Sequence, residues 1–160
     1  MPHLGHQEEP MSPRCPASLR YVNSGRLWAM PTAAAGGIVF DERHRLLLVL
    51  RSKSPAASTW SVPGGRCEPH EPAEAACVRE VGEETGLIVE VIRWVGRVHR
   101  PAPDGGEYVI DDFLCRVVGG ALRAGDDAAD AGWFDLAAMT GLPLAAGLLE
   151  ALTGWGLLPG

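Results

Sequence analysis

The sequence predicts a single α/β domain in which a mixed β-sheet lies between helices. Three observations support this fold: short apolar β-like runs recur along the chain, two helical segments interrupt them, and turn-forming residues separate them. With 160 residues, 46% of them hydrophobic and 21% charged, the chain has room for one domain with one hydrophobic core. We expect residues 25–160 to form that domain and residues 1–24 to be a disordered or variable arm.

The expected strands are short runs of apolar and β-branched residues bounded by turn signals. They cover residues 33–40, 46–51, 60–62, 87–98 and 107–118, with a short strand centred on Trp133-Phe134. Residues 41–45 indicate a hairpin-like connection between the first two strands. Residues 63–65, with the sequence Pro-Gly-Gly, predict a turn where the backbone can approach a ligand closely, and Trp60 is expected in the core beside it.

Two helices are expected. The first begins near Pro72, because proline is preorganised for the first helical position, and ends at Thr85 with Gly86 as its left-handed cap. Its apolar residues Val78 and Val81 lie on the face opposite its glutamates, so this helix can pack on a sheet. Residues 144–152 predict a closing amphipathic helix.

Three glutamates on the first helix carry the chemical signal. Glu80, Glu83 and Glu84 fall within about 100° of one another around a helix. Like charges on one face repel, so the cluster is destabilising unless a cation lies over it. Hard divalent cations such as Mg²⁺ prefer carboxylate oxygens and commonly bridge to phosphates. Taken alone, such a cluster is more often a solvated helix face.

The wider spacing resembles the Nudix box, the signature of hydrolases that act on a nucleoside diphosphate linked to another moiety. The pattern is glycine, five residues, glutamate, seven residues, then Arg-Glu-aliphatic-any-Glu-Glu-any-Gly-aliphatic. A chance match to it in a chain of this length is on the order of one in ten million or rarer. The resemblance implies a Nudix-type α/β/α sandwich with a mixed β-sheet. Every specified position is filled, by Gly65, Glu71, Arg79, Glu80, Val81, Glu83, Glu84, Gly86 and Leu87.

The resemblance also implies a role for each polar residue of the box. Glu80 and Glu84 become direct metal ligands, Glu83 a third ligand or the holder of metal-bound water, and the carbonyl of Gly64 a further ligand. The implied cofactor is Mg²⁺, with Mn²⁺ as a substitute. Arg79 is four residues from Glu83, so its guanidinium can orient the acids and lower their pKa values. We expect a structural role for Glu71, which ties the loop to Arg79.

Members of this family often draw a further acid, a ligand or general base, from a loop outside the box. Asp127 is our choice, although Gly125-Asp126-Asp127 would equally form a simple turn. Three other acids are rivals, and one of them, Asp112, has alternating neighbours that suggest a solvated strand face. The rivals are Glu107, Asp111 and Asp112.

Two residues outside the box are expected to bind substrate. Arg51, at the end of a strand, resembles the arginine that contacts phosphate in some relatives, and a surface arginine without a partner is the alternative. Tyr108 could stack on a base, as could Trp28 and Trp60. A lone aromatic residue at a strand end is, however, more often part of the core.

The substrate itself is less well determined. Relatives that cleave ADP-ribose often carry a proline at the distance from the box at which Pro103 stands, although 13 prolines make this agreement weak evidence. We expect ADP-ribose or a related nucleoside diphosphate sugar. The alternatives are a house-cleaning hydrolase of nucleoside triphosphates and, in a different class, a non-catalytic nucleotide-binding domain, which should show a damaged box.

The composition of the chain limits the classes of ligand and partner that we expect. A formal charge of −6 argues against a nucleic-acid backbone as the ligand. No apolar run approaches the ~20 residues of a membrane helix, and the N-terminus lacks the pattern of a signal peptide. Four cysteines without a C-x-x-C pair predict free thiols in a reducing compartment. We therefore expect a cytoplasmic protein acting on a small nucleotide, and the resemblance favours a homodimer.

Overall fold

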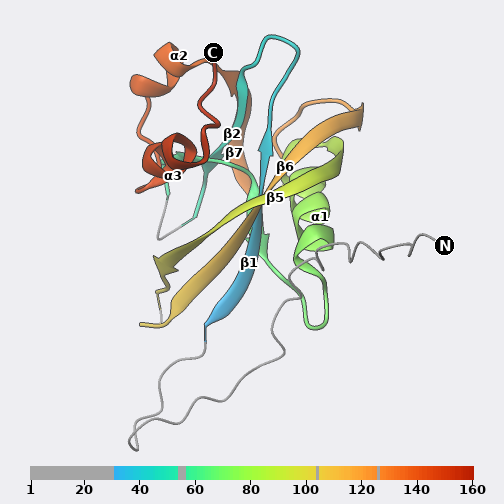
Figure 1. Ribbon diagram of the computed structural model, residues 1–160, viewed down its shortest axis with the longest axis vertical. Helices are drawn as coiled ribbons and strands as arrows, with labels where there is room; N and C mark the ends of the chain where they lie inside the picture. The colour runs from blue at the N-terminus through green and yellow to red at the C-terminus, as the bar shows by residue number, and fades with distance from the viewer. Residues whose placement is uncertain (1–30, 54–56, 104, 126) are drawn as a thin grey trace, which may run out of the picture.

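The computed structural model describes residues 31–53, 57–103, 105–125 and 127–160, so the expected arm over residues 1–24 lies outside the described residues. Two sheets and three helices make up this part of the chain (Figure 1). In chain order the elements are β1 (Thr32–Val39), β2 (Leu46–Arg51), β3 (Trp60–Ser61), β4 (Gly64–Arg66), α1 (Ala73–Thr85), β5 (Leu87–Pro101), β6 (Glu107–Gly120), β7 (Ala128–Phe134), α2 (Leu136–Thr140) and α3 (Leu148–Trp155).

The larger sheet has four strands in the order β4-β1-β6-β5, and the smaller has three in the order β3-β2-β7. The larger sheet is mixed, because β1 runs parallel to β6 and antiparallel to β4. Helix α1 covers one side of this sheet, while α2 and α3 lie toward the other side, and the smaller sheet lies between the helices (Figure 1). The predicted α/β class with a mixed sheet between helices is therefore confirmed.

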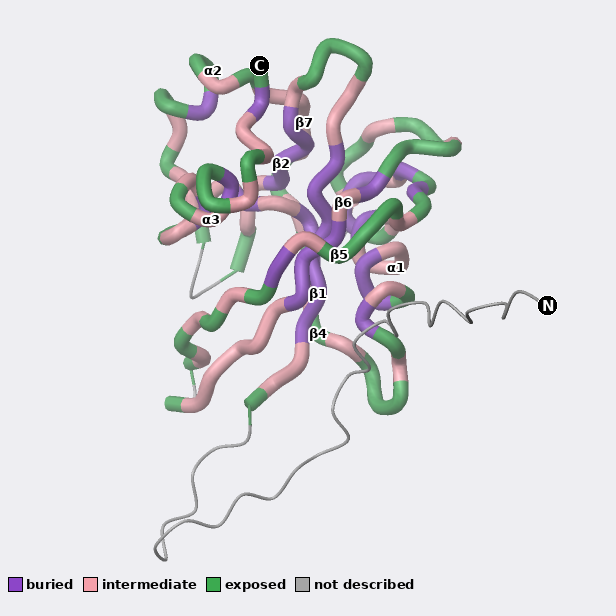
Figure 2. Tube along the Cα trace, in the orientation of Figure 1, coloured by how far each residue is buried: buried purple, intermediate pink, exposed green. Residues whose placement is uncertain are grey.

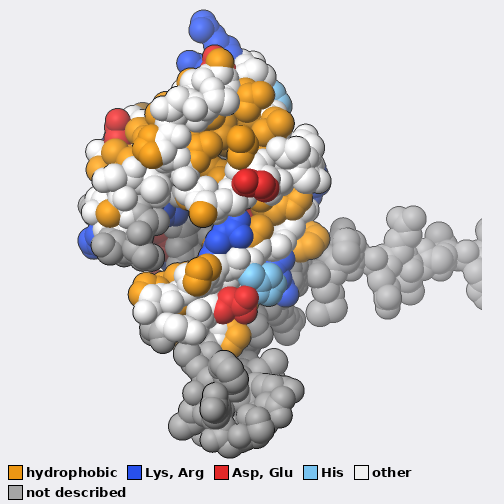
Figure 3. Space-filling view, turned by 90° about the vertical axis from the view of Figure 1, so that its left-hand side faces the viewer, with side chains coloured by type: hydrophobic (Ala, Val, Ile, Leu, Met, Phe, Trp, Pro, Cys, Tyr) orange, Lys and Arg blue, Asp and Glu red, His pale blue; other side chains and the backbone are white. Residues whose placement is uncertain are grey.

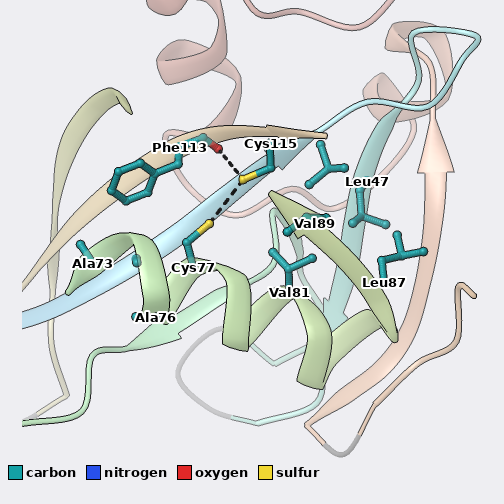
Figure 4. Close-up of a cluster of buried hydrophobic side chains, with 11 residues drawn as sticks. Leu47, Ala73, Ala76, Cys77, Val81, Leu87, Val89, Phe113 and Cys115 are labelled. Carbon is teal, nitrogen blue, oxygen red and sulfur yellow. Dashed lines mark hydrogen bonds between the residues drawn. The ribbon is translucent and has the colours of Figure 1, made fainter. Parts of the chain in front are cut away.

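Helix α1 forms as its sequence predicts. Pro72 is the residue that caps it rather than its first helical residue, and Gly86, at φ 73°, ends it in the left-handed conformation. Its buried face consists of small and branched side chains that pack on β1, β5 and β6 (Figure 4). The buried apolar residues of the helix are Ala73, Ala76, Cys77 and Val81, and Glu84 and Thr85 at its C-terminal end are buried as well. The spacing of three and four residues is that of one helix face, and it leaves the glutamates at the margin of the contact.

The buried residues form two clusters rather than the single core expected. One cluster joins α1 to β1, β5, β6 and Leu47 of β2, and the other joins α3 and Met139 to β1 and to Leu46 and Leu48 of β2. The two clusters lie on opposite faces of β1, since Val39 belongs to the first and Ile38 to the second. Figure 2 shows the buried segments gathered where the two sheets meet. Strand β1 of the larger sheet and strand β2 of the smaller sheet thus both lie between the two cores.

The hairpin-like connection expected over residues 41–45 is present, since Phe40 bridges antiparallel to Leu46 and the Asp41 N–H donates to the Arg45 carbonyl at 3.0 Å. Beyond this connection the two strands enter different sheets: β1 pairs along its whole length with β6, and β2 pairs with β3 and β7. The turn expected over residues 63–65 is wrong, because residues 64–66 form the edge strand β4, paired with residues 34–36. A Cβ atom at Gly64 would lie 2.3 Å from the Ala35 carbonyl, so the pairing requires glycine.

The C-terminal helices also differ from expectation. The closing helix begins at Leu148 rather than at residue 144, because Leu144 bridges to Trp60 and the Ala145 N–H donates to the Trp60 carbonyl at 2.8 Å. A short helix, α2, is additional; the side chain of Asp135 caps it by accepting from the Ala138 N–H. The later start of α3 thus comes from a contact between distant segments, whereas the cap of α2 is local.

The surface on the α3 side is largely apolar, with Lys and Arg side chains toward its middle and Asp, Glu and His side chains beside them (Figure 3). Within the part of the chain that the structure describes, no helix is both long enough and apolar enough to cross a membrane. The described cysteines, Cys67, Cys77 and Cys115, are free thiols, as expected.

Candidate active site

Strand β4 brings two consecutive glycines against two of the three glutamates. The N–H of Gly64 donates to Oε2 of Glu84 at 3.1 Å. A Cβ atom at Gly65 would lie 2.5–2.7 Å from the carboxylate atoms of Glu80. Any side chain at Gly65 would therefore displace that carboxylate. Gly64 and the first glycine of the box, Gly65, thus let the acidic margin of α1 lie directly on the backbone of β4.

Arg51, at the end of β2, lies among these groups. Its Nη1 donates to Oε1 of Glu84 at 2.8 Å and to the carbonyl of Gly64 at 3.3 Å. Its Nε donates to Oγ of Ser61 at 2.9 Å, and its Nη2 to the carbonyl of Val62 at 3.2 Å. The alternative of a surface arginine without a partner is therefore wrong. Contact between Arg51 and a phosphate stays a prediction.

The three glutamates differ in their exposure. The side chain of Glu84 is 6% exposed, that of Glu80 15% and that of Glu83 57%. Burial raises the pKa of Glu84, while Arg51 and the Gly64 N–H favour its charged form and oppose this rise. The most buried acid is thus the one with a cation and a backbone donor on its two oxygens.

Arg79 links the acids to the preceding loop. It donates two parallel hydrogen bonds of 2.8 Å to the oxygens of Glu71, and this pairing lowers the pKa of Glu71. Its Nη1 also lies 2.8 Å from Oε1 of Glu80 and 3.3 Å from Oε2 of Glu83. The contacts expected of Arg79 with Glu71 and Glu83 are present. The guanidinium of Arg79 thus fixes the position of the loop relative to the side chains of two of the glutamates.

The oxygen atoms of this site are of the kind that a hard divalent cation prefers, although in this structure they do not surround one common point. Among the described residues, no group of three or more Asp, Glu, His or Cys side chains is close enough to hold a metal ion. The oxygens of Gly64 and Glu84 are instead bridged by Arg51, and those of Glu80 and Glu83 by Arg79. All these donors are oxygens, which suit Mg²⁺ or Mn²⁺. An ion bound at Glu84 and Gly64 would have to replace the guanidinium of Arg51.

Asp127 lies on a loop that docks beside the box. The N–H of Gly125 donates to the carbonyl of Glu84 at 2.9 Å, and a Cβ at Gly125 would lie 1.7 Å from the carbonyl of Glu83. The carboxylate of Asp127 itself, 63% exposed, forms an ion pair with Lys53 at 2.7 Å. The structure therefore brings this loop, but not the Asp127 side chain, to the glutamates. Gly125 is a site residue that the sequence reasoning missed.

The other candidates lie elsewhere on the sheet. The hydroxyl of Tyr108 accepts from Arg66 at 2.8 Å, with the guanidinium carbon 5.5 Å from the ring centre. Trp60 packs edge-on against Phe134 at 4.9 Å, in the core as expected. Trp28 lies outside the described residues. No described contact joins Tyr108 to the glutamates.

The three rival acids have different surroundings. Glu107 lies 2.9 Å from His99 at the surface, and Asp111 accepts from Arg97 and Trp94. Asp112 is only 4% exposed, and its Oδ1 atom has no hydrogen-bond partner among the residues that the structure describes. The expectation of a solvated Asp112 is therefore wrong, because the strand face it occupies is covered by other elements. Alternation along a strand identifies a face but not what packs on it.

A strand of glycines against the acidic margin of a helix, in an α/β/α fold, defines a hydrolase of the Nudix type. Comparison with known proteins agrees: the NUDIX domain model matches residues 30–152, so the chain belongs to the NUDIX family. Hydrolases of this family act on small nucleotides and generally depend on a divalent metal.

Several relatives resemble this chain. It is 41% identical over 118 residues to the ADP-ribose pyrophosphatase of Methanocaldococcus jannaschii, a match that covers 73% of this chain and 69% of that protein. It is 36% identical over 105 residues to a putative 8-oxo-dGTP diphosphatase of Bacillus subtilis, covering 65% and 66%. The crystal structure of a MutT NUDIX hydrolase from Burkholderia pseudomallei superposes with a TM-score of 0.67 at 29% identity, covering 77% of this chain and 96% of that one.

Proposed function

We propose that this protein hydrolyses the phosphoanhydride of ADP-ribose or a related nucleoside diphosphate sugar, with Mg²⁺ as its cofactor and Mn²⁺ as a substitute. The observation that carries the proposal is the intact box built against β4, together with 41% identity to an ADP-ribose pyrophosphatase. Because all box acids are present, a non-catalytic domain is disfavoured.

Each residue of the site then has a role. The carboxylates of Glu84 and Glu80 and the carbonyl of Gly64 would hold the ion, and the exposed Glu83 would complete the set or orient water. A bound divalent ion polarises phosphate oxygens and lowers the pKa of water. Arg79 positions Glu80 and Glu83, since it contacts both and is anchored on Glu71.

Residues outside the box contribute to the substrate and to the proton transfer. Arg51, which donates to Glu84 and to the carbonyl of Gly64, would bind a phosphate oxygen of a substrate held at this site. Asp127 serves as general base after leaving Lys53, from a loop already docked on Glu84 through Gly125. Tyr108 stacks on the base once it leaves Arg66.

The remaining expectations form part of the proposal. The ligand is a nucleotide rather than a nucleic acid or a membrane, and the protein is cytoplasmic. A homodimer is supported by β5, an edge strand of the larger sheet with the exposed apolar side chains Ile88, Ile92 and Trp94.

A panel of substrates, with chromatography of the products, tests the function. Purified protein is incubated with Mg²⁺ or Mn²⁺ and with ADP-ribose, nucleoside diphosphate sugars and nucleoside triphosphates, 8-oxo-dGTP included. AMP with ribose 5-phosphate from ADP-ribose is the expected outcome. A monophosphate with pyrophosphate from a triphosphate would instead support the second candidate, house-cleaning hydrolysis, which the similarity to the Bacillus subtilis protein favours.

Glu84→Gln tests the assigned metal cluster. It should lower turnover more than tenfold, because loss of a metal ligand should raise the barrier by well over ~1.4 kcal/mol. The matched control is Glu74→Gln, the same substitution in the first turn of the same helix, which should retain wild-type turnover. A Glu84→Gln variant that keeps more than about a tenth of the wild-type rate would show that the cluster is assigned wrongly.

A further inference from the structure

Arg66 follows the first glycine of the box and is the last residue of β4. Its carbonyl accepts a hydrogen bond of 3.0 Å from Nη2 of Arg79, and its backbone pairs with Ala34 of β1. Arg79 also contacts Glu80 and Glu83. The backbone of Arg66 is therefore fixed relative to the glutamates of the site.

The side chain of Arg66 lies on the face of the larger sheet opposite α1. Successive residues of a strand point to opposite faces, and a Cβ atom at the preceding Gly65 would lie against Glu80 of α1. The exposed Arg66 side chain donates from Nη2 to the hydroxyl of Tyr108 at 2.8 Å, and its guanidinium carbon lies 5.5 Å from the ring centre. Tyr108 is on β6, and β1 runs between β4 and β6. The Arg66 side chain thus extends from the β4 edge across β1 to Tyr108.

Arg66 differs from the other two arginines of the site in its ion pairs. Arg51 is paired with Glu84, and Arg79 is paired with several carboxylates. Among the residues that the structure describes, Arg66 forms no ion pair, and Tyr108 is the one hydrogen-bond partner of its side chain. A guanidinium has several N–H donors, and its charge-assisted hydrogen bonds to phosphate oxygens are strong. Arg66 therefore brings an uncompensated positive charge and unused donors to the margin of an acidic site.

The open edge of β4 separates Arg66 from Arg51. β4 is the terminal strand of its sheet, and the N–H and C=O groups of Gly64 point outward from it to Glu84 and Arg51. Arg66 is two residues further along the strand, roughly 7 Å away. Two guanidinium groups therefore lie along this edge, one at each side of the glutamates. Because the Arg66 side chain is exposed, a ligand can reach it from solvent without displacing buried residues.

We propose that Arg66 binds the phosphate group nearest the nucleoside of the substrate, as a second phosphate-binding arginine beside Arg51. This inference rests on the proposed function, in which the base stacks on Tyr108 and the diphosphate lies at the glutamates. A nucleotide that joins these two places passes along the Arg66 side chain, which extends from one to the other. The substrate then has one direction in the site, with its nucleoside toward Tyr108 and its second moiety toward Arg51.

The test compares the affinities of AMP and adenosine for the full-length protein. These two ligands differ only in the phosphate group, and NMR titration with Mg²⁺ present measures both, weak binding included. Arg66→Gln should weaken the binding of AMP by about tenfold or more and leave that of adenosine unchanged, because it removes charge-assisted hydrogen bonds to the phosphate. Arg66→Lys keeps the charge without the planar fork, so its affinity for AMP should lie between those of Arg66→Gln and the wild type. The matched control, Arg116→Gln, removes an exposed arginine on the β5 side of the same sheet and should leave both affinities as in the wild type.

The adenosine measurement separates phosphate binding from a purely structural role. If Arg66 only holds Tyr108 in place, Arg66→Gln weakens the binding of AMP and adenosine by the same factor, and this result overturns the inference. An unchanged affinity for AMP overturns it as well. If the wild type hydrolyses ADP-ribose and either result is found, only the inference fails; if the wild type binds neither AMP nor adenosine, the proposed function fails with it.

Discussion

Asp112→Asn should change how the stability of the protein depends on pH. Burial raises the pKa of Asp112 from 3.8 to about 7 in the folded protein. Between those pH values the native state holds a proton that the unfolded chain has released. This contribution to stability is therefore fully present below about pH 4 and is lost as pH rises through about 7.

The size of the effect follows from the two pKa values. The difference between 3.8 and about 7 corresponds to about 4 kcal/mol in the free energy of unfolding. Of this, about 2–3 kcal/mol is lost between pH 5 and pH 8. Asparagine does not titrate, so the free energy of unfolding of the variant does not fall in this way. The difference in free energy of unfolding between the variant and the wild type should therefore increase by the same amount over that range.

Urea unfolding of both proteins at pH 5 and at pH 8 measures the effect. Other groups with shifted pKa values, such as Glu71 and Glu84, are common to both proteins and cancel in the difference. The stability of Asp112→Asn minus that of the wild type should rise by about 2–3 kcal/mol from pH 5 to pH 8. An unchanged difference would refute the reasoning, because it would mean that the folded protein does not hold the proton of Asp112.

Two further predictions concern the arginines of the site. Without divalent ions, Arg51→Met should lower the free energy of unfolding by about 3–5 kcal/mol, because it leaves Glu84 buried without its cation. Addition of Mg²⁺ should then raise the free energy of unfolding of the variant more than that of the wild type. An equal effect of Mg²⁺ on both proteins in urea unfolding would show that Arg51 and the ion do not share Glu84. Arg79→Lys keeps the charge but loses the parallel pair of bonds to Glu71, and should cost about 1.5–3 kcal/mol by the same measurement. Stability within error of the wild type would mean that this pair does not hold the loop.

The box and its helix were predictable because their signals are local. Helix α1 ends at Thr85 because Gly86 adopts the left-handed conformation, a choice made within one turn of helix. The spacing that puts Arg79 beside Glu83 is likewise a property of the helix alone. The contact of Arg79 with Glu71 needs only a short loop to fold back.

The predictions from sequence were wrong where a strand pairs with a segment that is distant in the sequence. Residues 63–65 were expected to form a turn, yet residues 64–66 pair as β4 with β1, which itself pairs with β6 much later in the chain. The same pairing buries Asp112, whose alternating neighbours had suggested a solvated face. Strand patterns state the period of the side chains but not which strand, sheet or helix will cover them.

The amino-acid sequence alone was sufficient to predict the family, the helix that carries the acids and the oxygen ligands suited to a divalent ion. It could not place Arg51 between Glu84 and Gly64, turn the Asp127 carboxylate toward Lys53, or lay the Asp112 carboxyl over Gly36. Those arrangements join segments from different strands and sheets. They depend on long-range pairing and burial, which the spacing of neighbouring residues does not encode.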